Sequence, residues 1–297
     1  MRLHRPDHTL LHIDISNQLR RSRNPRETAP MDFETIQYEL ADRVATITLN
    51  RPEQLNALSP MMIGELRRAY AAAEADDDVW LLLVTGNGRA FCTGADVTEI
   101  PEDGRVVYDE PYLSTFPQWE APQEGTPPFR TMTKPILAAI NGLCCGAGLD
   151  WVTTGDIVIA SDRAEFFDPH VSIGVVSGRE VVRLARALPT NIAMRMALMG
   201  RHERMGAQRA FDLGLVSEVV EHERLLDRAR EIASIVNRNA PLAVRGTRLA
   251  IRRGLDLPMY EAEIMAETFR ERVVRTDDAK EGPRAFVEKR QPVWRCR

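Results

Sequence analysis

The chain has 297 residues, of which 44% are hydrophobic and 28% charged, as in an ordinary soluble globular protein. Its net charge of −4 predicts no general attraction to nucleic acid or to an anionic membrane. No apolar run reaches the length of about 18 residues that a membrane span needs, so none is expected.

Residues 1–30 fit no core pattern and are expected to be a flexible extension. They contain His4, His8 and His12, whose spacing could mimic a metal-binding stripe on a helix. A flexible extension, or translation from an upstream start codon, is the favoured interpretation, because the family-like pattern begins at Met31. The extension lacks the apolar segment of a secretory signal.

After Met31 the sequence predicts strands that alternate with helices. Residues 43–49 alternate in polarity, as in a half-exposed strand. Ser59 can cap a helix that has Pro60 at its first position. Three short apolar runs are typical of buried strands, at 79–84, 136–140 and 157–160. The alternation predicts βαβ units with right-handed crossovers.

The second half is expected to be largely helical. Before it, residues 101–128 form a loop rich in proline, glutamate and aromatic residues, whose length suggests a lid or a pocket wall. Beyond Gly178 we expect a short strand at 215–220 and helices at 179–188, 192–199, 223–237, 241–254, 259–273 and 277–289.

Four cysteines, Cys92, Cys144, Cys145 and Cys296, lack the spacing of a zinc site, and no metal is expected. The adjacent pair Cys144 and Cys145 is expected to consist of small packing residues in a reducing compartment, with a redox pair as the alternative. Together with the lack of a secretory signal, this favours a cytoplasmic location.

Two loops of small residues follow two of the apolar strands. One is Thr93-Gly-Ala-Asp96, and the other is Gly146-Ala-Gly-Leu-Asp150. Small residues let backbone N–H groups come close to a ligand oxygen. Two such groups directed at one carbonyl form an oxyanion hole, which stabilises negative charge as it develops.

Four blocks of sequence resemble the enoyl-CoA hydratase/isomerase (crotonase) superfamily. They are Asn50 to Leu58, Thr85 to Asp96, Asn141 to Asp150, and Asp278 to Trp294. The resemblance implies an α/β crotonase (ClpP-like) fold, a spiral of ββα units. It divides the chain into a core at 31–240 and a helical trimerisation region at 241–297. It also implies a homo-oligomer, either a trimer or a dimer of trimers.

The resemblance places the two oxyanion donors at the N–H groups of Ala95 and Ala147. The family usually has glycine at the second position. Alanine carries the same N–H group and can serve, provided that its φ is negative. The alternative is that both loops are merely tightly packed turns.

The acid–base positions depart from the family pattern. Hydratases of the family hold the added water with two glutamates, and these positions match Asp150 and His170. An imidazole titrates near neutrality and can give or accept a proton, so the pair remains a workable acid and base. Asp150 is one methylene shorter than glutamate, which changes a geometry on which catalysis depends. Structural roles for both residues are the alternative.

Other branches of the superfamily have an aspartate where this chain has Gly178. This disfavours aryl-halide displacement and dienoyl isomerisation. A histidine at position 170 also resembles the β-diketone (C–C bond) hydrolases, although the acidic residue that follows it there is missing here.

Coenzyme A is expected as part of the substrate and not as a permanently bound cofactor. The family's adenine and pantetheine positions match Leu55, Ala57, Thr93, Ala95, Asp96 and Val97. Phe286 and Lys289 match residues that a neighbouring subunit contributes to the nucleotide. We expect an enoyl-CoA hydratase-like enzyme acting on an acyl-CoA thioester. The alternatives are an isomerase or β-diketone hydrolase on the same scaffold, and a non-catalytic acyl-CoA-binding protein.

Overall fold

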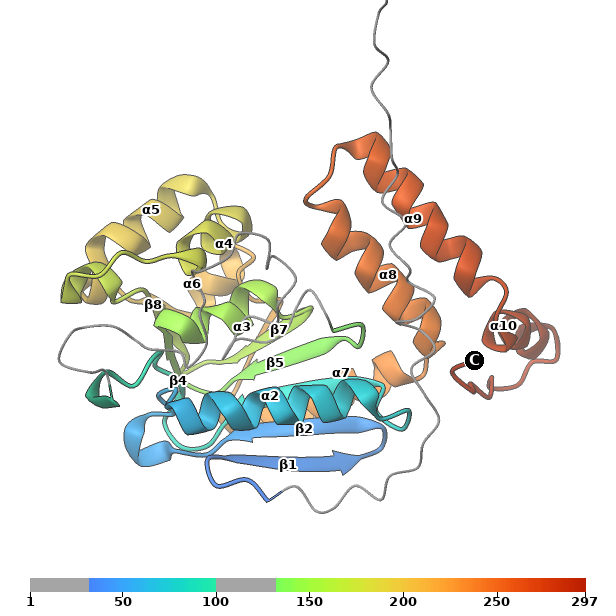
Figure 1. Cartoon of the computed structure of the whole chain (residues 1–297), viewed down its shortest axis with the longest axis horizontal. Helices are drawn as coiled ribbons and strands as arrows, with labels where there is room; N and C mark the ends of the chain where they lie inside the picture. Colours follow the sequence, from blue (N-terminus) through green and yellow to red (C-terminus); the bar gives the residue numbers. More distant parts are fainter. Residues whose placement is uncertain (1–31, 100–131) are drawn as a thin grey trace, which may run out of the picture. The chain divides into compact units, whose positions relative to one another are not determined.

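A sheet of mostly parallel strands carries the fold (Figure 1). The computed structural model describes residues 32–99 and 132–297, and Phe33–Arg297 forms one compact unit. The expected extension at 1–30 and the expected lid at 101–128 therefore lie outside the described residues. The sheet order is β1-β2-β3-β5-β7-β10. The strands are β1 (Ile36–Ala41), β2 (Val44–Leu49), β3 (Leu81–Gly86), β5 (Ile136–Ile140), β7 (Ile157–Ser161) and β10 (Glu218–Val220).

The central strands are apolar along their length because helices cover both faces of the sheet. The covering helices are α2 (Pro60–Ala75) and α7 (Leu225–Asn237). Leu66 of α2 belongs to the same buried cluster as Leu82 of β3. Ala229 of α7 joins Leu81 of the same strand in the cluster on the opposite face. Alternate residues of β3 thus enter two separate cores, as the two-residue period of a strand requires.

A second, small sheet has the order β4-β6-β8-β9. Its strands are β4 (Ala90–Cys92), β6 (Leu143–Cys145), β8 (Glu165–Phe167) and β9 (Met205–Gly206). β4, β6 and β8 are parallel to one another, and each follows a long strand of the first sheet after a short connection. β6 leads into α3 (Leu149–Thr154), and β8 leads towards α4 (Arg179–Ala187). This repetition is the spiral of ββα units that the sequence predicts.

Most of the predicted helices occur within a few residues of their expected bounds. Ser59 caps α2 as expected, since its side chain accepts a hydrogen bond from the backbone N of Met62 at 3.1 Å. The later helices are α5 (Thr190–Met199), α6 (Ala207–Asp212), α8 (Pro241–Gly254), α9 (Met259–Val273) and α10 (Asp277–Val287). Neither β1, α3, α6 nor the small sheet was predicted from the sequence. No helix of the described ranges is long and apolar enough to cross a membrane.

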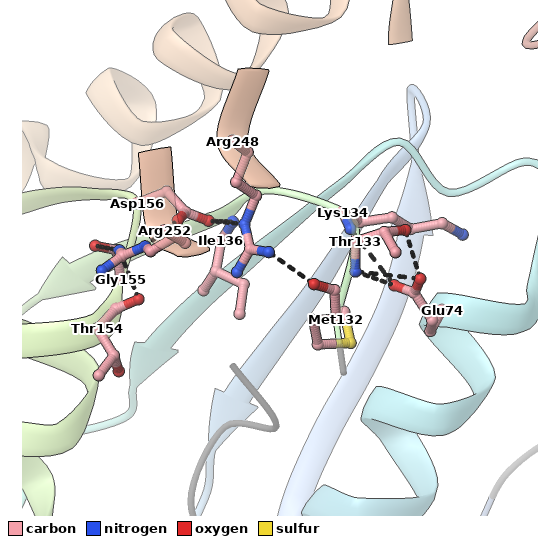
Figure 2. A network of polar contacts seen from close by, with 10 residues as sticks. All are labelled: Glu74, Met132, Thr133, Lys134, Ile136, Thr154, Gly155, Asp156, Arg248 and Arg252. Atoms are coloured by element: carbon pink, nitrogen blue, oxygen red, sulfur yellow. Dashed lines mark hydrogen bonds and ion pairs between the residues drawn. The ribbon is translucent and has the colours of Figure 1, made fainter. Parts of the chain in front are cut away.

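A polar network ties α8 to the core (Figure 2). Asp156, directly before β7, pairs with Arg248 at 2.6 Å and with Arg252 at 2.9 Å. The same carboxylate accepts the backbone N–H of Ile136 at 2.8 Å. Arg248 also donates to the backbone oxygen of Met132 at 2.6 Å, so the start of β5 is held to the C-terminal helices. A buried ion pair needs such additional hydrogen bonds to offset its desolvation.

Tyr70 and Trp151 form a buried hydrogen bond between α2 and α3, with Trp151 Nε1 2.8 Å from the Tyr70 hydroxyl. Burial raises the pKa of Tyr70. Tyr70→Phe would leave the indole N–H buried without this partner, which costs about 1–3 kcal/mol. We expect equilibrium urea unfolding to show a loss of stability in this range. Tyr260→Phe is the matched control. Tyr260 is 71% exposed, so this variant should have almost the same free energy of unfolding as the wild type. Equal stability of both variants would contradict a role for the hydrogen bond.

Candidate active site

Two loops lie against each other at one end of the parallel strands, the loop after β2 and the loop after β4. Thr93 Oγ1 donates to the backbone oxygen of Leu55 at 3.2 Å. The backbone N of Leu58 donates to Gly94 O at 2.8 Å. The structure therefore brings together the expected coenzyme A residues of both loops, although they are far apart in sequence.

An ion pair locks the same two loops. Arg51 contacts Asp96 at 2.9 Å and donates to the backbone oxygen of Ala57 at 2.7 Å. Hydrogen bonds from Thr98 and Arg51 lower the pKa of Asp96 against the opposing effect of burial. Val97 is exposed, so this part of the predicted binding surface is open. Asp96 thus fixes the loop as an anion rather than acting as a proton donor.

Two asparagines hold β4, the strand that leads into the loop of Gly94 and Ala95. Asn56 Nδ2 and Asn141 Nδ2 both donate to the backbone oxygen of Ala90, at 2.8 and 3.2 Å. Close backbone approach is also required at Gly142, where a Cβ would lie 2.2 Å from Arg89 O. The motif asparagines are therefore structural residues that set the position of β4.

The peptide group of Ala95 is oriented by its neighbours. Leu58 donates to Gly94 O and accepts from Asp96 N, at 2.8 and 3.1 Å, which forms a parallel bridge to Ala95. In a parallel bridge the central residue's own N–H and C=O point to the other side of the strand. The Ala95 N–H group is therefore turned away from Leu58.

The second loop brings the backbone nitrogen of Ala147 close to Gly94, the residue before Ala95. A Cβ built on Gly94 would lie 3.2 Å from the nitrogen of Ala147 and 3.4 Å from Gly146 Cα. Gly94 has φ +89° and Gly146 has φ +55°, conformations that glycine adopts without strain. Ala147 is half-buried and does not have a positive φ, which meets the condition set for this donor.

Asp150 lies in the first turn of α3 and is fully buried. Its Oδ1 is 2.5 Å from Arg183 Nη1, and its Oδ2 is 3.3 Å from Arg179 Nε. Burial raises the pKa of Asp150 above its ordinary value, and Arg183 and Arg179 oppose that rise. A carboxyl with a raised pKa is suited to proton transfer, but this one is also the counter-ion of two guanidinium groups of α4.

His170 stands at the start of the turn η4 (His170–Ile173), with 21% of its side chain exposed. Its ring contacts Asp168, and this hydrogen bond raises the pKa of the imidazole against the effect of burial. The charges of Glu180 and Asp150 act in the same direction. Pro169 lies 3.8 Å from the position of a Cβ on Gly146. The turn that carries His170 therefore adjoins the loop of Gly146 and Ala147.

The sequence and the fold of the chain are similar to those of known proteins. The family model for enoyl-CoA hydratase/isomerase matches residues 39–297. The (E)-benzylidenesuccinyl-CoA hydratase of Thauera aromatica is 36% identical over 264 residues, 88% of this chain and 98% of that protein. The short-chain-enoyl-CoA hydratase of Clostridium acetobutylicum is 32% identical over 271 residues, 88% and 97% of the two chains. A crystal structure of an enoyl-CoA hydratase/isomerase from Mycobacterium paratuberculosis has a TM-score of 0.85 and 74% identity, covering 90% of this chain and 100% of that one.

The chain belongs to the enoyl-CoA hydratase/isomerase family. The predicted crotonase fold is thereby confirmed, and the function is enoyl-CoA hydratase-like. Within the described residues, no group of three or more histidine, cysteine, aspartate or glutamate side chains is arranged to hold a metal. Cys92, Cys144 and Cys145 are buried free thiols, and burial raises the pKa of Cys92 and Cys145 to about 12, as suits packing residues.

Two of the residues matched to the family lie away from this site within one chain. Phe286 is 85% exposed on α10, and Lys289 follows the same helix. The tail beyond α10 contacts Arg238 through Trp294, and the neighbouring Asn237 contacts Asp42 in the β1–β2 turn. The loop that carries Ala95 contacts the segment after the other end of β2, away from the β1–β2 turn (Figure 1). A contribution to a neighbouring subunit remains a prediction.

Four further residues contact the predicted pair Asp150 and His170 or hold its partners, and the sequence did not predict these contacts: Asp168, Ser177, Arg179 and Arg183. Asp168 had a signal, because an aspartate two residues before a histidine can reach that residue's backbone N–H in a turn. No sequence signal points to the two arginines of α4, because their contact with Asp150 depends on how α3 and α4 pack.

Proposed function

We propose that this enzyme adds water across the double bond of an enoyl-CoA thioester. The observation that carries the proposal is the meeting of the Gly94–Ala95 and Gly146–Ala147 peptide groups beside the turn of His170. The reaction needs no permanently bound cofactor, because coenzyme A enters as part of the substrate. The buried free thiols support a reducing location, which we propose to be the cytoplasm.

The thioester oxygen would accept hydrogen bonds from the N–H groups of Ala95 and Ala147. When water attacks the β-carbon, the electron pair of the double bond moves towards this oxygen and forms an enolate. Fixed backbone donors bind this charge more strongly than the neutral carbonyl, which lowers the barrier. The two loops are held by Asn56, Asn141 and Arg51, so the donors need no rearrangement during the reaction.

His170 is the proposed acceptor of the water proton, because its imidazole is partly exposed whereas Asp150 is fully buried. The O–H bond of water breaks as the C–O bond forms at the β-carbon, and the proton passes to the imidazole. The imidazolium of His170 then gives this proton to the α-carbon of the enolate, so that H and OH have both been added and the ring is neutral again. Asp150 is the proposed partner of His170 in this proton transfer. Burial raises the pKa of Asp150, and the charge of Asp150 raises the pKa of the His170 imidazole.

The loops that hold Leu55, Ala57, Thr93, Asp96 and Val97 would contact the pantetheine and adenine of coenzyme A. The hydrogen bond between Thr93 and Leu55 and the ion pair between Arg51 and Asp96 support this proposal, since they give the surface a fixed shape. A preformed surface binds a flexible ligand without the cost of ordering the protein.

Lys289 is proposed to bind a phosphate of coenzyme A on a neighbouring copy, in a trimer or a dimer of trimers. Lys289→Ala should raise the Kd for coenzyme A by about two- to fivefold at low salt, the effect of one exposed ion pair. Isothermal titration calorimetry measures this. Lys280→Ala, which removes an exposed lysine of α10, is the matched control. An unchanged Kd in Lys289→Ala, or a protein that sediments as a monomer, would remove Lys289 from the site.

The proposed reaction is tested by following hydration of a panel of 2-enoyl-CoA thioesters. The panel should pair a short acyl chain with a bulky, carboxylated one, because the relatives are named for both kinds of substrate. Turnover of any member supports the proposal. Cleavage of a β-diketone substrate without hydration of any enoyl-CoA would replace it with a hydrolase.

A further inference from the structure

Asp168 holds His170 by two contacts from a fully buried position. Its Oδ1 accepts the backbone N–H of His170 at 3.0 Å and lies 2.5 Å from His170 Nδ1. The Asp168 side chain is 0% exposed, whereas the imidazole retains 21% of its exposure. Nδ1 of the ring is thus directed at a buried carboxylate, whereas part of the imidazole remains exposed.

The second oxygen of Asp168 is also held. Ser177 Oγ donates to Asp168 Oδ2 at 2.5 Å. The chain returns to Asp168 through a turn at Gly174, which has φ +75°. Burial opposes ionisation of Asp168, but hydrogen bonds from His170 and Ser177 outweigh it and lower the pKa of the carboxyl. Asp168 therefore remains an anion that can only accept hydrogen bonds.

This arrangement decides which nitrogen of His170 carries the proton. Because an ionised carboxylate cannot donate, Nδ1 must hold the hydrogen, and the neutral ring has its lone pair on Nε2. We propose that Asp168 is a positioning residue that fixes this tautomer and the ring orientation, with Ser177 holding the carboxylate in place. The inference rests on the proposed function, in which Nε2 accepts the proton of water.

The carboxylate also balances the charge that appears during the reaction. When water gives its proton to Nε2, the ring becomes an imidazolium whose Nδ1–H remains on Asp168, and the Nε2 proton leaves again when the cycle closes. The other charged groups near the ring are Asp150, which is paired with Arg179 and Arg183, and Glu180, which lies 3.7 Å from Arg179. Asp168 is the carboxylate in direct contact with the ring.

A cap for the turn would explain only part of this geometry. To cap the turn, Asp168 would need only one carboxylate oxygen to accept the backbone N–H of His170, and it would need no contact with the imidazole ring. Asp162 has such an arrangement, since its Oδ1 accepts the backbone N of His222 at 3.1 Å while the ring of His222 contacts Ser161 Oγ at 3.0 Å. Asp162 is exposed, whereas Asp168 is buried and contacts the ring itself.

Asp168→Asn in the full-length enzyme tests the inference. The amide can donate to Nδ1, which moves the ring proton to Nε2 and removes the base. We expect kcat on an enoyl-CoA substrate to fall by about 10²–10⁴, up to the effect of losing the general base itself, with little change in KM. The acid limb of the pH profile should move to lower pH, because the hydrogen bond that favours the charged ring is lost. Asp162→Asn is the matched control and should leave kcat unchanged.

Two further measurements separate a positioning role from a structural one. In the His170→Ala background, Asp168→Asn should cause no further fall in kcat, because the carboxylate acts through the imidazole ring. Nitrogen-15 NMR of the imidazole, assigned by comparison with His170→Ala, should show Nδ1 protonated in the wild type and the opposite tautomer in Asp168→Asn. The NMR result needs no substrate, so it tests the inference even if the enzyme hydrates none of the panel. Additive losses in the double variant, or an unchanged tautomer, would overturn the inference.

Discussion

His170→Ala should lower kcat on an enoyl-CoA substrate by about 10²–10⁴, the usual range for loss of a general acid or base. The Kd for a non-reactive acyl-CoA should change little, because the oxyanion donors are backbone groups and remain in place. The measurement is steady-state hydration across a range of pH, together with calorimetric binding.

The pH profile provides a second, independent signature. Only a neutral imidazole can accept the water proton, so wild-type activity should fall as the pH is lowered through the pKa of His170. The hydrogen bond to Asp168 raises that pKa, so the limb should lie above the ordinary value of about 6.5. This limb should disappear in His170→Ala. His202→Ala, an exposed histidine, is the control and should retain both rate and limb. Full hydratase activity in His170→Ala would remove His170 from the mechanism.

Ala147→Pro should lower kcat by about 10²–10³, because proline has no N–H group and one oxyanion donor is lost. Ala147 lies in the first turn of the short helix η3 (Gly146–Gly148), where proline is tolerated in helices. Ala147→Gly is the matched control, since it keeps the N–H group and should retain activity within a few fold.

Thermal unfolding of both variants at position 147 separates a missing donor from a damaged fold. A Tm close to that of the wild type, with the expected loss of kcat in Ala147→Pro alone, supports the oxyanion role. Wild-type kcat in the proline variant would mean that the N–H of Ala147 does not contact the thioester.

Local signals explain which parts of the fold were predictable. β5 matches its prediction because an apolar run is bounded by Pro135 and Asn141, and α8 does so because Pro241 and Gly254 mark its ends. By contrast, β1 is largely exposed and α6 has only six residues, so neither has a strong periodic pattern. Short elements of this kind are specified by their neighbours rather than by their own sequence.

The same distinction applies to the site. The tight turns at Gly94 and Gly146 were predictable because glycine is the residue that adopts their positive φ without strain, whereas the oxyanion role of these turns stays a prediction. The contact of Ser177 with Asp168 was not, because it depends on a loop that closes over nine residues. Likewise, the pairing of Arg183 with Asp150 joins two helices whose packing no local pattern describes.

Asp156 gives the chain a constraint on how it can be divided. Its carboxylate is shared by the first peptide group of β5 and by two arginines of α8, so it belongs to both the core and the C-terminal helices. A fragment that ends before α8 would keep Asp156 and lose both cations, and a separate C-terminal fragment would carry those cations without their anion. Division of the chain before α8 would therefore leave an uncompensated buried charge on each side, which is strongly destabilising.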